Sequence, residues 1–109
     1  MTRDDVICEA RNSGAGGSCA ELGGADLSGL DLRRVNLSRA DLSDALLIGA
    51  QLVDCGLGGA TICNADLTGA NMTGADLRDA DLSGATLAGA TMPDGRTFEA
   101  YQRDPLSGL

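Results

Sequence analysis

The sequence contains no lysine, no histidine and no tryptophan, and its only aromatic residues are one phenylalanine and one tyrosine. The chain therefore has no imidazole general base, no amine for a Schiff base and no lysine for a phosphate-binding loop. Its eight basic residues are all arginines, and 16 acidic residues leave a net charge of −8. Direct nucleic-acid binding requires a basic face and is not expected. We expect a protein that is not an enzyme and has no cofactor.

Long apolar runs are also missing. The longest, Ala45–Ile48, is far shorter than the roughly 20 residues that cross a bilayer. Met1–Ala20 carries acids and glycines where a secretory signal has an apolar core. A single cytoplasmic domain without membrane attachment is the expectation.

The four cysteines do not form a metal-binding or redox motif. They are Cys8, Cys19, Cys55 and Cys63, and no two of them stand in a CxxC pair. With no CxxC pair and no histidine they do not match the usual ligand spacing of a zinc site, so no metal is expected. An even number would suit two disulfides in a secreted chain, but the absence of an export signal favours free thiols.

An aliphatic residue recurs every five positions. A helix would rotate successive members by about 140° and leave no apolar stripe, and a strand would send alternate members to opposite faces. A chain that bends at each repeat and winds into a coil keeps them all inside. The fifteen repeat centres are Leu22, Leu27, Leu32, Leu37, Leu42, Leu47, Leu52, Leu57, Ile62, Leu67, Met72, Leu77, Leu82, Leu87 and Met92.

The residues around each centre repeat as well, as in Ala65-Asp66-Leu67-Thr68-Gly69. Alanine stands two residues before twelve centres, and aspartate or asparagine directly precedes eight. This pattern, from Ala20 to Asp94, resembles the pentapeptide-repeat family. The resemblance implies an all-β fold, a right-handed quadrilateral β-helix with four pentapeptides per coil and therefore about 3.75 coils. In this register Cys55 points inward and Cys63 outward.

The segments outside the repeats are expected to cover the two ends of the solenoid. Residues 1–19 form an N-terminal cap with Val6 and Ile7 as its apolar contacts, and residues 95–109 form a C-terminal cap or tail. Pro93-Asp94-Gly95 forms a turn before that tail.

Thr97 is expected to cap a short helix that runs to about Asp104, where Pro105 ends it. Phe98 and Tyr101 share one face of this helix. They are contacts either of an end cap or of a dimer, because the quinolone-resistance members of the resembled family pair through C-terminal aromatic elements. The short stack favours a monomer, with a dimer through the C-terminal segment as the alternative.

Three aliphatic residues occupy outward positions, which are otherwise mostly polar or glycine. Leu46 and Ile48 flank the centre Leu47, and Val53 lies on the next wall. They are either scattered surface aliphatics or a small interaction patch. Three arginines precede them, and they either balance nearby acids such as Asp31 and Asp54 or contact an anion or a partner: Arg33, Arg34 and Arg39.

We therefore interpret the chain as a non-catalytic, bacterial-type solenoid that acts as a structural or protein-interaction module with an unknown partner. The alternative is a DNA mimic that binds DNA gyrase or a related topoisomerase through its acidic surface. The stacking order weakens this alternative, because residues 20 apart put Leu46 after Asp26, and only Glu21 and Asp41 are acids on adjacent coils among the residues that precede the centres.

Overall fold

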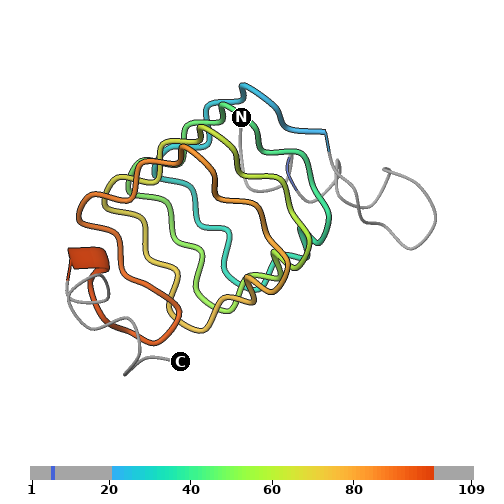
Figure 1. Cartoon of the computed structure of the whole chain (residues 1–109). Helices are drawn as coiled ribbons and strands as arrows, with labels where there is room; N and C mark the ends of the chain where they lie inside the picture. Colours follow the sequence, from blue (N-terminus) through green and yellow to red (C-terminus); the bar gives the residue numbers. More distant parts are fainter. Residues whose placement is uncertain (1–5, 7–20, 100–109) are drawn as a thin grey trace.

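The chain winds into a solenoid with 20 residues in each turn (Figure 1). The computed structural model describes residue 6 and residues 21–99. Each residue directly before a centre pairs in parallel with the residue 20 positions later, from Glu21 with Asp41 to Asn71 with Thr91. Four pentapeptides therefore complete one coil, and corresponding residues of successive coils lie side by side.

The coils are joined by backbone hydrogen bonds that repeat at each wall. Leu27 N–H donates to the carbonyl oxygen of Leu46 at 2.7 Å, and Gly29 N–H donates to that of Ile48 at 2.9 Å. In the other direction, Leu46 N–H donates to the carbonyl oxygen of Ala25 at 2.9 Å. These contacts form isolated bridges and not continuous strands, since the chain turns a corner after every few residues.

Each corner is a tight turn that requires a left-handed residue. Leu30 N–H donates to the carbonyl oxygen of Leu27 at 3.2 Å, and Gly29 between them has a φ of 72°. This is the geometry of a type II turn, whose third residue has a positive φ. Every residue two positions after a centre, from Gly24 to Gly89, has a positive φ. Eight of these are glycines and six are not: Arg34, Arg39, Asp44, Asp54, Asn64 and Asp79.

The repeat centres fill a continuous core. The centres from Leu22 to Met72 are buried, with 3% or less of each residue exposed, and this confirms their inward assignment. Cys55 is also buried, with Val35 and Ala75 in the same column on the neighbouring coils. Leu77, which lies on the last coil, is only partly buried because no complete coil follows it.

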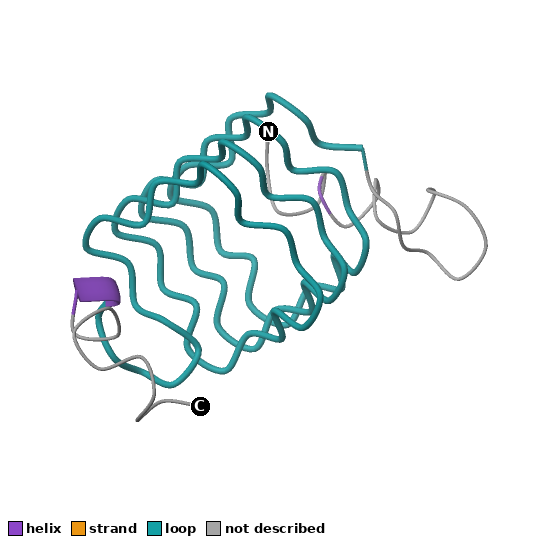
Figure 2. Ribbon diagram, viewed as in Figure 1, coloured by secondary structure: helices purple, strands orange, loops and turns teal. Residues whose placement is uncertain are grey.

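The two ends of the solenoid are only partly described. Val6 has a helical conformation and is completely buried in the core cluster, whereas the rest of the proposed N-terminal cap, including Ile7, lies outside the described residues. At the other end, a helical turn comprises Phe98 and Glu99 (Figure 2). The predicted continuation of this helix, with Tyr101, lies outside the described residues.

The five-residue pattern ends after Met92. Gly95 N–H donates to the carbonyl oxygen of Met92 at 2.8 Å, which confirms the predicted turn at Pro93-Asp94-Gly95. The positive φ falls on Gly95 and not on Asp94, so this turn differs from those of the repeats. Thr97 then pairs antiparallel with Thr91, and the chain folds back along the last wall. Within the described ranges, no helix is long and apolar enough to cross a membrane.

Candidate interaction surfaces

Two large aliphatic side chains project from one wall of the solenoid. Leu46 is 40% exposed and Ile48 is 42% exposed, whereas Leu47 between them is buried at 1%. Val53, on the next wall, is half-buried. The outward positions predicted for Leu46 and Ile48 are therefore confirmed, and Val53 contributes less exposed surface than expected.

The neighbouring coils place carboxylates on both sides of this apolar surface. Leu46 forms parallel bridges with Asp26 on the preceding coil and with Asp66 on the following coil. Ile48 accepts a hydrogen bond through its carbonyl oxygen from Gly29 N–H on the preceding coil. Leu46 is thus bounded by acids on both neighbouring coils, whereas Ile48 has Ser28 and Thr68 at the corresponding positions.

At least one of the arginines Arg33, Arg34 and Arg39 forms an ion pair with a nearby acid. Arg33 donates two hydrogen bonds to Asp31, from Nε to Oδ1 at 2.8 Å and from Nη2 to Oδ2 at 2.9 Å. Arg39 lies over the bare backbone of Gly59, where an added Cβ would stand 3.1 Å from Arg39 Cγ. For Arg33 the predicted balance with a nearby acid is confirmed.

The outer aspartates stabilise the turns of the solenoid. Asp41 Oδ1 accepts a hydrogen bond from Ser43 N–H at 3.0 Å, and Asp76 Oδ1 accepts one from Arg78 N–H at 3.1 Å. The Arg78 guanidinium also donates to the Asp76 carboxylate, and together these bonds lower the pKa of Asp76 to about 2. A lowered carboxylate pKa means that this stabilisation is present at neutral pH and is lost as the pH falls from the ordinary aspartate pKa through about 2. These carboxylates therefore have a structural role whether or not a partner binds them.

The half-buried thiol of Cys63 is not activated. It donates a hydrogen bond to Asp81, and this bond, followed by desolvation and the charge of nearby aspartates, raises its pKa. A raised pKa keeps the thiol protonated, whereas a nucleophilic cysteine needs a lowered one. Cys55 and Cys63 are both free thiols. Within residues 21–99 and Val6, no group of three or more cysteine, aspartate or glutamate side chains is arranged to hold a metal ion.

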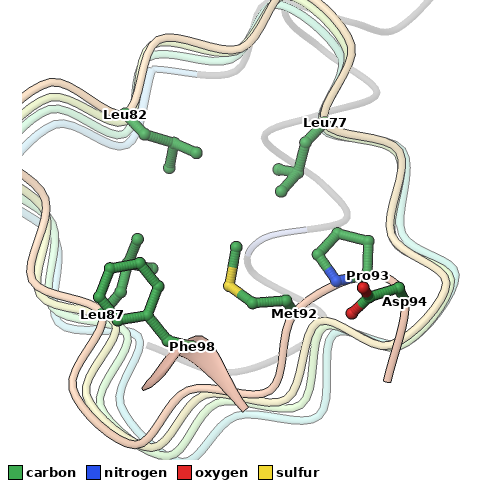
Figure 3. A pocket seen from close by; sticks show the side chains of 7 residues that line it. All are labelled: Leu77, Leu82, Leu87, Met92, Pro93, Asp94 and Phe98. Atoms are coloured by element: carbon green, nitrogen blue, oxygen red, sulfur yellow. The ribbon is translucent and has the colours of Figure 1, made fainter. Parts of the chain in front are cut away.

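A hollow of about 580 Å³ lies at the C-terminal end of the core (Figure 3). Leu77, Leu82, Leu87 and Met92 point toward its centre from the last coil, and Phe98 contributes its ring. The sequence interpretation did not identify this hollow. The sequence does contain a signal for the hollow. The five-residue period ends at Met92, so the last four centres have no further centre stacked on them.

A second, shallower hollow of about 340 Å³ lies on a side wall. It results from the pentapeptide Gly56–Ala60, which has glycine at all three outward positions and therefore presents no outward side chain. Its charged rim contains both signs and comes from the preceding and following coils: Arg39, Asp76, Arg78 and Asp79.

Comparison with known proteins agrees with this parallel β-solenoid architecture. The family model described as pentapeptide repeats matches residues 20–59 and 55–92. The chain therefore belongs to the pentapeptide-repeat family, whose members fold as right-handed quadrilateral β-helices. A search of the curated proteins found no match.

Solved structures of the same family are similar over the repeats. A pentapeptide repeat protein of the Arabidopsis thaliana thylakoid lumen is 39% identical with a TM-score of 0.51, covering 66% of this chain and 53% of that one. HetL, involved in heterocyst differentiation regulation in the cyanobacterium Nostoc, is 38% identical with a TM-score of 0.46, covering 73% of this chain and 41% of that one. QnrB1, a plasmid-mediated fluoroquinolone resistance protein, is 24% identical with a TM-score of 0.41, covering 67% of this chain and 44% of that one. The chain thus matches only about half the length of these proteins, or less.

Proposed function

We propose that this protein is a non-catalytic interaction module that binds a protein partner on the wall carrying Leu46 and Ile48, with Val53 at the edge of the contact. The observation that carries the proposal is the exposure of Leu46 and Ile48, which are 40% and 42% exposed and are the most exposed large hydrophobic residues in the described part of the chain. Exposed aliphatic side chains lower the solubility of a protein unless a partner covers them. Clustered ones mark interaction sites more often than single ones do.

The flanking residues specify the chemistry of the partner. Asp26 and Asp66 pair with Leu46 from the coils on either side. A partner segment with an aliphatic side chain would cover Leu46 and Ile48, and adjacent arginine or lysine would meet the two carboxylates. The aliphatic contact would supply most of the affinity, and the charges would supply orientation and speed of association.

The remaining predictions about architecture belong to the same proposal. The repeats form about 3.75 coils, residues 1–19 form an N-terminal cap and residues 95–109 form a C-terminal cap or tail. Burial of Val6 in the core supports the first cap, and the helical turn at Phe98 supports the second.

Affinity capture from the host lysate tests the interaction surface. The bait is compared with a Leu46→Asp/Ile48→Asp variant and with a Thr86→Asp/Ala88→Asp control, which adds the same charge at the same positions two coils further along that wall. We expect a partner that binds the wild type and the control and is lost with the first variant. A partner captured equally by all three baits would refute the assignment of the wall.

The net charge of −8 supports a second candidate, mimicry of DNA toward gyrase or a related topoisomerase. Continuous rows of acids are what such mimicry needs, and here the bridges place Asp26 beside Leu46, Asp31 beside Gln51 and Asp41 beside Thr61. Recovery of gyrase subunits by all three baits would favour this candidate over the aliphatic wall.

A further inference from the structure

The coil that carries Leu46 and Ile48 on one wall has a hollow on the opposite wall. Gly56 follows Leu46 by half of the 20-residue coil. The hollow of about 340 Å³ is lined by Gly58 and Gly59 of the same coil. We call Leu46 and Ile48 the aliphatic knob, and we call the recess over Gly56, Gly58 and Gly59 the glycine hollow. A projection and a recess thus lie on opposite sides of the molecule at nearly the same height along the solenoid.

The fold does not require glycine at two of the three positions of the hollow. Gly59 has a φ of 69°, as the corner of a repeat needs, but Gly56 and Gly58 are not among the residues with a positive φ. A Cβ added to Gly56 would stand 3.5 Å from Asn36 Oδ1, and one added to Gly58 would stand 3.6 Å from the carbonyl oxygen of Arg78. Both are ordinary van der Waals distances. Neither backbone conformation nor crowding therefore accounts for the bare floor of this recess.

The charges beside the knob and beside the hollow are complementary. Asp26 and Asp66 pair with Leu46 from the preceding and the following coil. The rim of the hollow carries Arg39 from the preceding coil and Arg78 from the following coil. The two acids and the two arginines therefore have the same spacing along the solenoid. The wall of the knob has no basic residue among its described outward positions.

The rim of the hollow also carries two acids, Asp76 and Asp79. Asp76 accepts hydrogen bonds from Nε and Nη2 of Arg78, at 3.0 and 2.9 Å. The Arg78 side chain is nevertheless 86% exposed, so its other N–H groups remain within reach of a second carboxylate. Asp79 lies at the following corner, where its φ is positive.

We propose that the glycine hollow receives the aliphatic knob of a second copy of this chain, so that copies associate side by side. With the two solenoid axes parallel, the knob covers the bare coil, Asp26 faces the row of Arg39 and Asp66 faces the row of Arg78. This inference rests on the proposed function, since it uses the same wall and names a second copy as the partner.

The contact is heterologous, because the two surfaces that meet are different. Each copy in a pair keeps an open knob on one side and an open hollow on the other, so association extends into a row and does not close at a dimer. The contact involves one wall of each copy and is small, so we expect association to be weak and dependent on protein concentration.

Sedimentation of the native chain in reducing buffer tests the association. We expect the average mass to rise with protein concentration beyond that of a dimer. Raising the salt concentration from about 0.05 M to about 0.5 M should weaken the association several-fold, because salt screens the ion pairs at the edge of the contact. A chain that stays monomeric at about 1 mM would overturn the proposal.

Three double variants locate the two surfaces. Each places asparagine and threonine at the two outward positions of one pentapeptide, a pair that Asn71 and Thr73 already form in this protein. None of them changes the formal charge, and circular dichroism checks that each keeps the fold. The first removes the knob, the second fills the hollow and the third is a control on another wall: Leu46→Asn/Ile48→Thr, Gly56→Asn/Gly58→Thr and Thr61→Asn/Cys63→Thr.

We expect the knob variant and the hollow variant to stay monomeric when alone, under conditions in which the wild type and the control associate. Mixed in equal amounts, these two variants should form a complex of two copies and no larger, because the mixture offers one intact knob and one intact hollow. Self-association of the hollow variant equal to that of the wild type would overturn the proposal. A monomeric wild type that still captures a lysate partner through Leu46 and Ile48 would overturn self-association and leave the proposed function standing.

Discussion

The thiol of Cys55 donates a hydrogen bond to the carbonyl oxygen of Val35, 3.2 Å away and one coil earlier. The same carbonyl oxygen accepts the N–H of Gly56 at 3.0 Å, so the thiol is attached to the hydrogen-bond ladder between two coils. Cys63, only eight residues later, lies on the outer side of its wall and is half-buried. The two thiols thus differ in access to solvent although both are free.

This difference predicts selective alkylation. In the native protein iodoacetamide should modify Cys63 and leave Cys55 unmodified, because modification of Cys55 requires the wall to open. Mass-spectrometric mapping of the modified residues checks this, with Cys63→Ser as the control that removes the more accessible of these two thiols. Modification of Cys55 in the native Cys63→Ser variant at a rate similar to that in denaturant would contradict the inward placement.

The contact between Cys63 and Asp81 predicts the pH dependence of that reaction. Asp81 raises the pKa of Cys63, so less reactive thiolate is present at a given pH than for an ordinary cysteine. Asp81→Asn removes the charge, and the pKa of Cys63 should fall, which increases its alkylation rate at mildly alkaline pH. Asp79→Asn removes the same charge on another wall and serves as the control. Equal acceleration by both variants would indicate a general charge effect.

The backbone conformation of Arg34 predicts that a glycine variant is more stable than an alanine variant at this position, which is the reverse of the usual order. Its φ is 63°, and a left-handed conformation costs a residue with a side chain about 1–2 kcal/mol, which glycine avoids. Arg34→Gly should therefore be more stable than Arg34→Ala by about 0.5–1 kcal/mol, after allowing for the greater unfolded-state entropy of glycine. Urea denaturation of both variants measures the difference.

The neighbouring Arg33 provides the matched control, since its φ is not positive. There the ordinary order should hold, with Arg33→Ala more stable than Arg33→Gly by about 0.5–1 kcal/mol. Both variants at this position lose the ion pair with Asp31, so the comparison isolates the backbone. If the alanine variant were more stable than the glycine variant at both positions, this would argue against a left-handed conformation at Arg34.

The inward and outward leucines should differ strongly in their response to charge. Leu67 is buried at 1%, and Leu67→Ala should cost about 2–5 kcal/mol, with Leu67→Asp costing more because it buries an unpaired charge. Leu46→Asp should cost less, about 0.5–1.5 kcal/mol, because the position is exposed and the new carboxylate meets only the like charges of Asp26 and Asp66. Thermal and urea unfolding of the variants test this, and a well-folded Leu67→Asp protein would contradict the register.

Most of the solenoid could be predicted from the sequence because the period leaves few alternatives. Leu46 and Ile48 could be assigned outward from their distance to Leu47, and Cys55 inward from its place in the column of Val35. Val53 was less predictable, since its burial depends on how side chains of adjacent coils lie over it. The half-buried state of Leu77 likewise depends on the missing coil and not on its own pentapeptide.

The sequence by itself determined the five-residue bend and the identity of the inward residues, because these depend on spacing and residue type. Only the tertiary structure decided that Asp81 raises the pKa of Cys63 and that a hollow remains beside Phe98. These relationships join residues about 20 positions apart or arise where stacking stops, and the contacts between coils exist only when the chain is wound. The physical reason is that a repeat specifies its own bend locally, whereas neighbours across coils are set by the length of the turn and by where the winding ends.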